Sequence, residues 1–334
     1  MQNTLKSMNA LEWGMLFALS LLWGGSFFFV GIAIREVPVF TLVTVRVLGG
    51  ALILCGWLAW RGQSRNGQSR NGQPQGGQSR SGPARSDMQW PRSWAAWRAF
   101  FVMGLLNNAI PFSLIAWGQS HIPSGLASIL NATTPLWTVL FAHFIADGER
   151  LTPARLLGLL AGLGGVMVLI GPRAFAFDGG GLVAWLAPCA VLLATCSYAA
   201  AALYGRRFKR MGIAPLLPAA AQGLMAACVM LPLALLLDQP WTLPLPSPQA
   251  LAALLGLGLF SSALGYALYF RILDSAGATN INLVTFLIPP SAILLGIAFL
   301  GESLAPQHLA GMALIGLGLA AIDGRLLRYF KLAR

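Results

Sequence analysis

Ten long runs of apolar residues, separated by short polar or charged segments, make up most of the chain. Each run approaches the roughly 20 residues that an α-helix needs to cross the hydrocarbon core of a bilayer. The runs lack the alternation of barrel strands, so they predict an all-α integral membrane protein with ten transmembrane helices. The predicted helices cover residues 12–34, 39–60, 97–117, 124–146, 153–171, 180–204, 214–237, 250–270, 279–300 and 307–324.

The composition agrees with this pattern. Hydrophobic residues make up 57% of the 334 residues and charged residues 10%, with a mean hydropathy of +0.69. A soluble domain carries about 25% charged residues. So few charges cannot solvate the surface of a chain this long, and most of that surface is expected to face lipid.

The basic residues mark one side of the membrane. With the N-terminus in the cytoplasm, the cytoplasmic segments hold 19 of the 22 Lys and Arg residues, while Arg35 and Arg173 fall outside and Arg46 lies within a helix. Cytoplasmic loops carry such an excess, so we predict a multi-pass protein of the inner (plasma) membrane with both termini cytoplasmic. The net charge of +12 then reflects topology, and no nucleic-acid partner is expected.

The segment between the second and third predicted helices, about residues 61–92, has the opposite composition. It contains two consecutive copies of Ser-Arg-Asn-Gly-Gln and almost nothing apolar. Such a segment cannot bury enough surface to offset the entropy lost on ordering. We predict a disordered cytoplasmic loop here.

One short motif occurs twice, as GERLTPARLLG from Gly148 and as GESLAPQHLAG from Gly301. Six of the eleven positions are identical, and the copies join the fourth helix to the fifth and the ninth to the tenth. The chain therefore divides into two five-helix halves, residues 1–171 and 172–334. Because five is odd, the second half crosses the membrane in the opposite direction. An inverted repeat around a central cavity is typical of secondary transporters, whose substrate site lies between the halves.

Four segments carry a family resemblance: LLWGGSFFFVGIAIRE, TVRVLGG, NATTPLWTVLFAHFIADGERLTPARLLGLLAGLGGVMVLIG and GATNINLVTFLIPPSAILLGIAFLGESLAPQHLAGMALIGLGLA. They resemble the EamA-type drug/metabolite transporter superfamily over nearly the whole chain outside residues 61–92 and the tails. The resemblance implies ten helices, a central cavity shared by helices 1–4 and 6–9, and helices 5 and 10 packed outside it. It also implies export of amino acids or other small metabolites, and one branch is similar to exporters of aromatic amino acids.

Arg46 is the only charged residue well inside a predicted helix. An ionisable group at that depth is costly unless it faces the protein interior or has a partner. We interpret it as an anchor for a substrate carboxylate; the alternative is a structural hydrogen bond to helix-end carbonyls. Gln222 is its counterpart in the second half when RVLGGA is aligned with QGLMAA.

Further polar and aromatic residues lie in the same apolar segments. Polar groups in hydrocarbon must face protein, water or substrate, so the polar members either bind substrate or bond between helices. The aromatic members either stack against a substrate or serve packing and interface anchoring. These substrate-binding candidates are Asn107, Asn108, Asn131, Thr134, Trp137, Tyr198, Ser261, Ser262, Tyr266 and Asn282.

The favoured function is a secondary transporter that exports small metabolites, above all amino acids with aromatic or other neutral side chains, by alternating access. A multidrug or other metabolite exporter, or a passive facilitator of the same fold, is the alternative, and the driving force stays open. The acidic residues fall at helix ends and in loops, which disfavours a membrane enzyme. The four cysteines lack metal-ligand spacing, so no metal or cofactor is expected, and a monomer is the working expectation.

Overall fold

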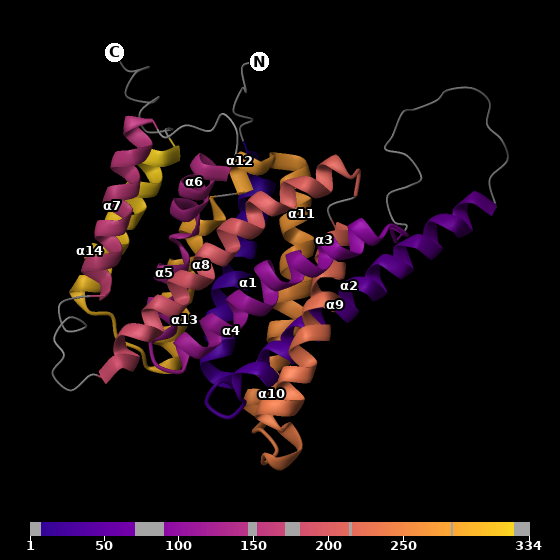
Figure 1. Ribbon diagram of the computed structural model, residues 1–334, viewed down its shortest axis with the longest axis horizontal. Coiled ribbons are helices and arrows are strands. Elements are labelled where there is room, and N and C mark those ends of the chain that lie inside the picture. Colours follow the sequence, from indigo (N-terminus) through magenta and orange to yellow (C-terminus); the bar gives the residue numbers. More distant parts are fainter. Residues whose placement is uncertain are drawn as a thin grey trace.

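The computed structural model describes residues 8–70, 90–145, 152–170, 181–213, 216–281 and 283–323. Within these ranges every regular element is a helix, and no β-strand is present. Figure 1 shows an upright helical bundle in which α10 lies at the lower end and α6 and α12 lie at the upper end. The predicted all-α class is therefore confirmed for the part of the chain that is described.

The first part of the chain forms five helical runs. They are α1 (Ala10–Ala33), α2 (Val39–Arg70), α3–η1–α4 (Trp94–Gly104, Leu105–Ala109, Ile110–Gln119), α5–α6 (Ser124–Asn131, Thr134–Ile145) and α7 (Pro153–Ile170).

The second part follows the same order. Its elements are α8 (Gly181–Arg210), α9–η3 (Leu216–Leu233, Ala234–Asp238), the short η4 (Pro240–Thr242), α10–η5–α11 (Pro248–Gly256, Leu257–Leu264, Gly265–Ala276), α12 (Ala278–Ile281), α13 (Val284–Leu300) and α14 (Pro306–Asp323).

Seven of the described helical runs are long and apolar enough to cross a bilayer, and three further apolar helices are shorter. The seven are Ala10–Ala33, Val39–Trp60, Trp94–Gln119, Ser124–Phe144, Leu182–Arg210, Leu216–Asp238 and Pro248–Leu273; the shorter ones are Arg155–Ile170, Val284–Leu300 and Pro306–Ile322. The exposed surface fits lipid, because large apolar side chains such as Leu157, Leu236 and Phe299 are more than half exposed. The chain is a membrane protein with several spans.

The first ten residues of the predicted loop, residues 61–70, are helical in the structure. Helix α2 does not stop at Trp60 but continues to Arg70, and it projects from the bundle on the right of Figure 1. Extending an existing helix adds one hydrogen bond for each residue fixed and needs no new nucleus. The first proline after Trp60 is Pro74, so nothing forces the helix to end earlier. The prediction of disorder for residues 61–70 is wrong; residues 71–89 lie outside the described ranges.

Three described helical runs contain π-helical turns, and two of these turns, η1 and η5, lie at corresponding places. η1 interrupts the run from Trp94 to Gln119, and η5 interrupts the run from Pro248 to Ala276. A π-turn widens the helix locally, leaves backbone groups available and is common at functional sites. These are the segments in which the sequence placed the Asn107–Asn108 and Ser261–Ser262 pairs.

Two other runs are broken. α5 ends at Asn131 and α6 begins at Thr134, while α12 ends at Ile281 and α13 begins at Val284. In the first break, the Thr133 and Thr134 hydroxyls donate to the carbonyls of Leu130 and Asn131, at 2.7 and 2.8 Å. Pro135 cannot donate a backbone hydrogen bond to the Asn131 carbonyl, so the Thr134 hydroxyl satisfies a carbonyl that the helix leaves free.

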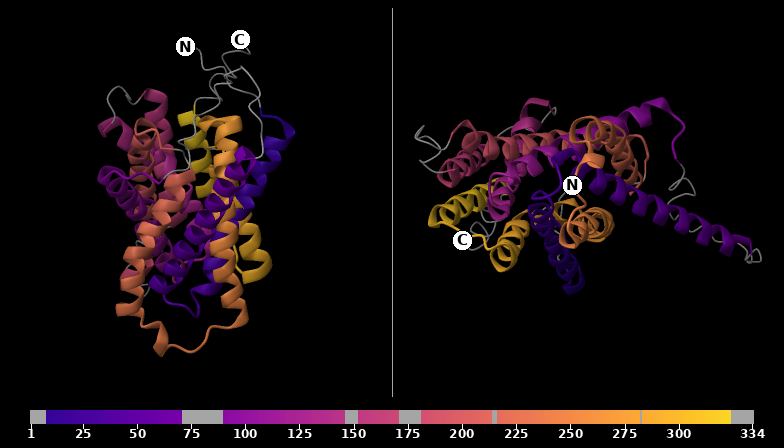
Figure 2. Two further views of the ribbon diagram at one scale, coloured as in Figure 1. Left: turned by 90° about the vertical axis from the view of Figure 1, so that its right-hand side faces the viewer. Right: turned by 90° about the horizontal axis from the view of Figure 1, so that it is seen from below.

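Helices α7 and α14 pack against each other at one side of the bundle (Figures 1 and 2). The contact is antiparallel, since Gly158 near the start of α7 meets Gly318 near the end of α14, and Gly165 meets Gly311. A Cβ atom at Gly158 would lie 2.5 Å from the Gly318 carbonyl oxygen, and one at Gly165 would lie 2.8 Å from that of Gly311. Small residues of this kind let two membrane helices approach closely.

Candidate functional site

The helices surround a cavity of about 790 Å³, within the usual size range of small-molecule sites. Its walls come from α1, α2, the α3–η1–α4 run, the α5–α6 break, α8, α9, η5, α11 and α13. Among the described residues, none that lines it comes from α7 or α14. This agrees with the expected division into cavity-forming helices and an outer pair.

The cavity opens toward one end of the bundle. Its lining reaches the end of α8 and the turn that follows, where Lys209 and Gly212 are exposed. At the opposite end the lining stops at Val30 and Gln119, which are buried. Gln119 seals this end in part, since its Nε2 donates to the Phe27 carbonyl at 2.9 Å.

Arg46 lies on the cavity wall and is only 8% exposed. Its guanidinium carbon sits 3.7 Å from the centre of the Phe112 ring, a cation–π contact. Within the described residues its Nε has no hydrogen-bond partner. Lining residues include no Asp or Glu in the described chain, so the cavity presents a buried cation without a lining carboxylate.

A polar network crosses the cavity from η1 to α9 and α11. Asn107 Nδ2 donates to Gln222 Oε1 at 3.3 Å and to the Tyr266 hydroxyl at 3.2 Å. The Tyr266 hydroxyl in turn donates to Asn108 Oδ1 at 3.4 Å. Gln222 therefore bonds to Asn107 rather than standing free, and the network joins elements more than 100 residues apart in sequence.

Aromatic side chains form a second wall. Trp23 stacks on Tyr269 with ring centroids 5.5 Å apart. Trp23 and Tyr266 pack edge to face, with ring centroids 6.5 Å apart. Phe270 stacks on Tyr266, also at 6.5 Å. Such rings offer a large rigid apolar surface with polar tips.

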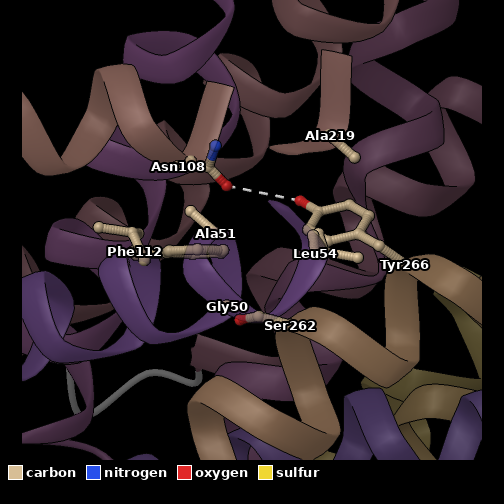
Figure 3. Close-up of a pocket in the computed structure, with 10 residues that line it drawn as sticks. Gly50, Ala51, Leu54, Asn108, Phe112, Ala219, Ser262 and Tyr266 are labelled. Carbon is tan, nitrogen blue, oxygen red and sulfur yellow. Dashed lines mark hydrogen bonds between the residues drawn. The ribbon is translucent and has the colours of Figure 1, made fainter. Parts of the chain in front are cut away.

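A small pocket of about 10 Å³ adjoins this region, between α2, η1, α4, η5, α9 and α11 (Figure 3). That volume holds about one water molecule. Figure 3 shows Asn108 and Ser262 on opposite sides of Gly50 and Ala51. Asn108 Nδ2 and Ser262 Oγ have no partner in the described chain, so both are available to water or to a ligand group that enters.

The structure brings most of the predicted site residues together. Arg46, Asn107, Asn131, Thr134, Tyr198, Gln222, Ser261, Ser262 and Tyr266 line the large cavity.

The remaining predicted residues divide into three cases. Asn108 lines the adjoining small pocket. Trp137 lines neither space, and its Nε1 is buried without a partner in the described chain. Asn282 lies outside the described residues.

Phe112 and Gln119 are among the lining residues that sequence reasoning missed. Phe112 supports Arg46 from α4, and Gln119 marks the closed end. Phe112 follows Asn108 by four positions, which places both on one helix face, and that spacing was the available signal. The Gln119 Oε1 and Asn131 Oδ1 atoms have no partner in the described chain.

Comparison with known proteins places these features in a family. The model of the EamA-like transporter family matches residues 83–171 and again residues 185–322. The chain is 26% identical over 295 residues to the uncharacterized inner membrane transporter YedA of Escherichia coli K12, covering 87% of this chain and 84% of that protein.

Other relatives are similarly distant. Protein PecM of Dickeya dadantii is 28% identical over 229 residues, covering 67% of this chain and 72% of that one. A probable terminal-alkyne amino-acid exporter of Streptantibioticus cattleyicolor is 29% identical over 230 residues, covering 64% and 69%. One crystal structure of a protein superposes with a TM-score of 0.60 at 21% identity, covering 96% of this chain and 99% of the other. The two family matches fall one in each part of the chain and together cover more than half of it, and this chain belongs to the EamA-like transporter family.

Proposed function

We propose that this protein is an inner-membrane secondary transporter that exports small metabolites, above all amino acids with aromatic or other neutral side chains, by alternating access. The observation that carries the proposal is the buried Arg46 in a cavity whose lining has no described carboxylate. A substrate carboxylate would supply the missing counter-charge, and a guanidinium can hold it through two parallel hydrogen bonds. The naming of one relative as an amino-acid exporter points the same way.

Other parts of the cavity lining offer partners for the ammonium group and the side chain of an amino acid. Orphan acceptors at Gln119 Oε1 and Asn131 Oδ1 suit an ammonium group, because an unpaired buried acceptor is costly. The Trp23, Tyr266 and Tyr269 rings suit an aromatic or apolar side chain. Together these groups favour a zwitterion with an apolar body.

We further propose ten membrane spans arranged as two inverted five-helix halves. Corresponding π-turns and helix breaks in the two parts of the chain support this arrangement. The glycine contacts support it as well. Gly158 and Gly165 correspond to Gly311 and Gly318 at the 153-residue offset of the motif, and each meets the counterpart of the other. Contacts that exchange partners in this way are expected around a two-fold axis.

In the proposed orientation the cavity faces the cytoplasm. The basic residues at the end of α8, Arg206, Arg207, Lys209 and Arg210, lie at its open end. Loops rich in Lys and Arg stay on the cytoplasmic side. An exporter in this state is ready to load its substrate.

A multidrug exporter is the second candidate, but the cavity lining disfavours cationic drugs because its charged members among the described residues are Arg46 and Lys209. A passive facilitator remains the alternative for mechanism, since the same lining offers no carboxylate as a proton carrier.

The test is uptake by the purified protein in proteoliposomes, with a panel of labelled amino acids and quaternary-ammonium drugs. Each is measured with and without an imposed pH gradient. The proposal expects amino-acid flux above that of protein-free vesicles and no drug flux. Drug flux without amino-acid flux would contradict it, and flux that ignores the gradient would identify a facilitator or an exchanger.

A further inference from the structure

Carboxylates of one part of the chain bind helix starts of the other part at the closed end of the cavity. The strongest case is Glu302, in the turn between α13 and α14. Glu302 Oε1 accepts from the Ser124 backbone N–H at 2.7 Å, and Oε2 accepts from the Ser124 hydroxyl at 2.9 Å and the Gly125 N–H at 3.1 Å. Glu302 thus caps the first turn of α5.

Asp238 and Glu36 make equivalent contacts. Asp238, at the end of η3, accepts from the Thr41 backbone N–H at 2.6 Å and from its hydroxyl at 2.9 Å, in the first turn of α2. Glu36 precedes α2 and accepts from the Ser247 N–H at 2.6 Å and its hydroxyl at 2.7 Å, just before α10. Each of these pairs joins residues about 200 positions apart in sequence.

The three contacts lie at one end of the bundle. The α1–α2, α4–α5, α9–α10 and α13–α14 connections all fall there by chain order, and Figure 1 and the left view of Figure 2 place α10 and the turn before it at the lower end. A carboxylate at a helix start meets unsatisfied N–H groups and the positive end of the helix dipole. These contacts are therefore charge-assisted and span the two parts of the chain.

The local backbone aims Glu302 at α5. Gly301 has φ +67° and ends α13, and the Glu302 N–H donates to the Gly296 carbonyl at 3.1 Å. This is the turn that glycine favours at a helix end. The Glu302 carboxylate then lies so close to Gly296 that a Cβ there would overlap it. The Gly301–Glu302 pair thus forms a turn and a helix cap.

We propose that Glu302, together with Asp238 and Glu36, forms a set of latches that holds this end of the cavity closed. This inference rests on the proposed alternating access. In the described state, these contacts close the cavity at the end opposite its opening. To open this end, α5 must part from the α13–α14 turn, and the Glu302 contacts must break. Weakening a latch then shifts the population toward opening at this end.

The test measures a distance and needs no substrate. Spin labels are placed at His121 and Ser303, two exposed positions on either side of the Glu302 contact, after the four native cysteines are changed to alanine. The purified protein is examined by pulsed electron-spin resonance in detergent and in nanodiscs. In Glu302→Gln, which keeps the side-chain shape but loses the charge, the ratio of longer to shorter distances should rise at least about tenfold, the effect of 1.4 kcal/mol.

One control variant and one further variant of the same contact complete the test. Glu12→Gln makes the same change in a carboxylate that caps its own helix α1, and it should leave the distances unchanged. Gly296→Ala keeps the Glu302 charge but fills the space its carboxylate uses, so it should raise the longer distances as Glu302→Gln does.

Unchanged distances in folded Glu302→Gln or Gly296→Ala protein would overturn the latch, as would failure of both variants to fold, which would make the contact purely structural. The distance measurement involves no substrate. If the distances change as expected but the protein transports no amino acid, the Glu302 contact still controls opening, and only the proposed substrate is wrong.

Discussion

Among single residues, Arg46 packed against the Phe112 ring forms the buried charged part of the cavity wall. Arg46 stands out because it is the one ionised group deep inside an apolar run, and the structure puts it on the cavity wall. The Phe112 ring against it could not be predicted, because the pair joins α2 to α4 through packing that no local pattern encodes. Trp137 shows the converse: its residue type suggested a site, but it lines neither space.

Arg46→Gln should abolish most substrate binding while leaving the protein folded. A buried anion without a counter-charge costs several kcal/mol, so the affinity for a carboxylate-bearing substrate should fall at least about tenfold. Arg46→Lys should restore only part, since an ammonium keeps the charge but loses the two-pronged contact. Ligand-induced shifts in Tm of the purified variants measure this, with an amide analogue of the substrate as the control that should be little affected. Normal affinity in Arg46→Gln would make Arg46 a structural residue.

Glu36 should give a pH-dependent stability. The Ser247 N–H and hydroxyl stabilise its charged form and lower the pKa of this exposed carboxyl below its ordinary value. A group with a lowered folded-state pKa stabilises the protein above its unfolded pKa and loses that contribution as pH falls through the folded one. Glu36→Gln should therefore lower Tm at neutral pH, and its difference from wild type should shrink in acid. A difference that does not change with pH would show that the charge of Glu36 has no role.

At the scale of elements, helix positions were predictable and helix irregularities were not. Each predicted run overlaps a described helix, and seven of these helical runs are long and apolar enough to cross a bilayer while three are shorter. A backbone in lipid must satisfy its hydrogen bonds internally, which favours helices. The extension of α2 to Arg70 was missed because composition describes burial rather than helix propagation. The π-turns η1 and η5 depend on how neighbouring helices pack, so local sequence does not reveal them.

The packing of α7 on α14 predicts a position-specific effect of added methyl groups. Gly165→Ala would place a Cβ 2.8 Å from the Gly311 carbonyl oxygen, whereas a Cβ at the neighbouring Gly164 would meet nothing within 4 Å. Overpacking of this kind costs about 1–3 kcal/mol. Gly165→Ala should lower Tm of the purified protein by several degrees, whereas Gly164→Ala should leave it unchanged or raise it. Equal effects of the two substitutions would contradict the helix contact.

At the scale of the whole molecule, the sequence supplied the family and the place of the cavity. The duplicated motif pointed to an interface between two parts of the chain, and that is where the cavity lies. The carboxylate contacts at the closed end were not predictable, because Glu302, Asp238 and Glu36 sit in turns whose partners are fixed only by the tertiary fold.

The proposed orientation predicts opposite labelling at the two ends of the bundle. A cysteine at Leu245, which is 96% exposed in the α9–α10 turn, should react in intact cells with a membrane-impermeant thiol reagent. A cysteine at Lys209, at the open end of the cavity, should react only after the membrane is permeabilised. The native cysteines are removed in both variants, and the reversed pattern would invert the topology.

Exchange in proteoliposomes loaded with an aromatic amino acid tests whether Arg46 anchors a transported carboxylate. The wild-type protein should take up the labelled amino acid well above protein-free vesicles. Arg46→Gln should lose at least about nine-tenths of that exchange, a change of 1.4 kcal/mol or more. Trp137→Phe, which changes an aromatic residue away from the cavity, should keep it. Exchange by Arg46→Gln at the wild-type rate, in folded and reconstituted protein, would contradict the account.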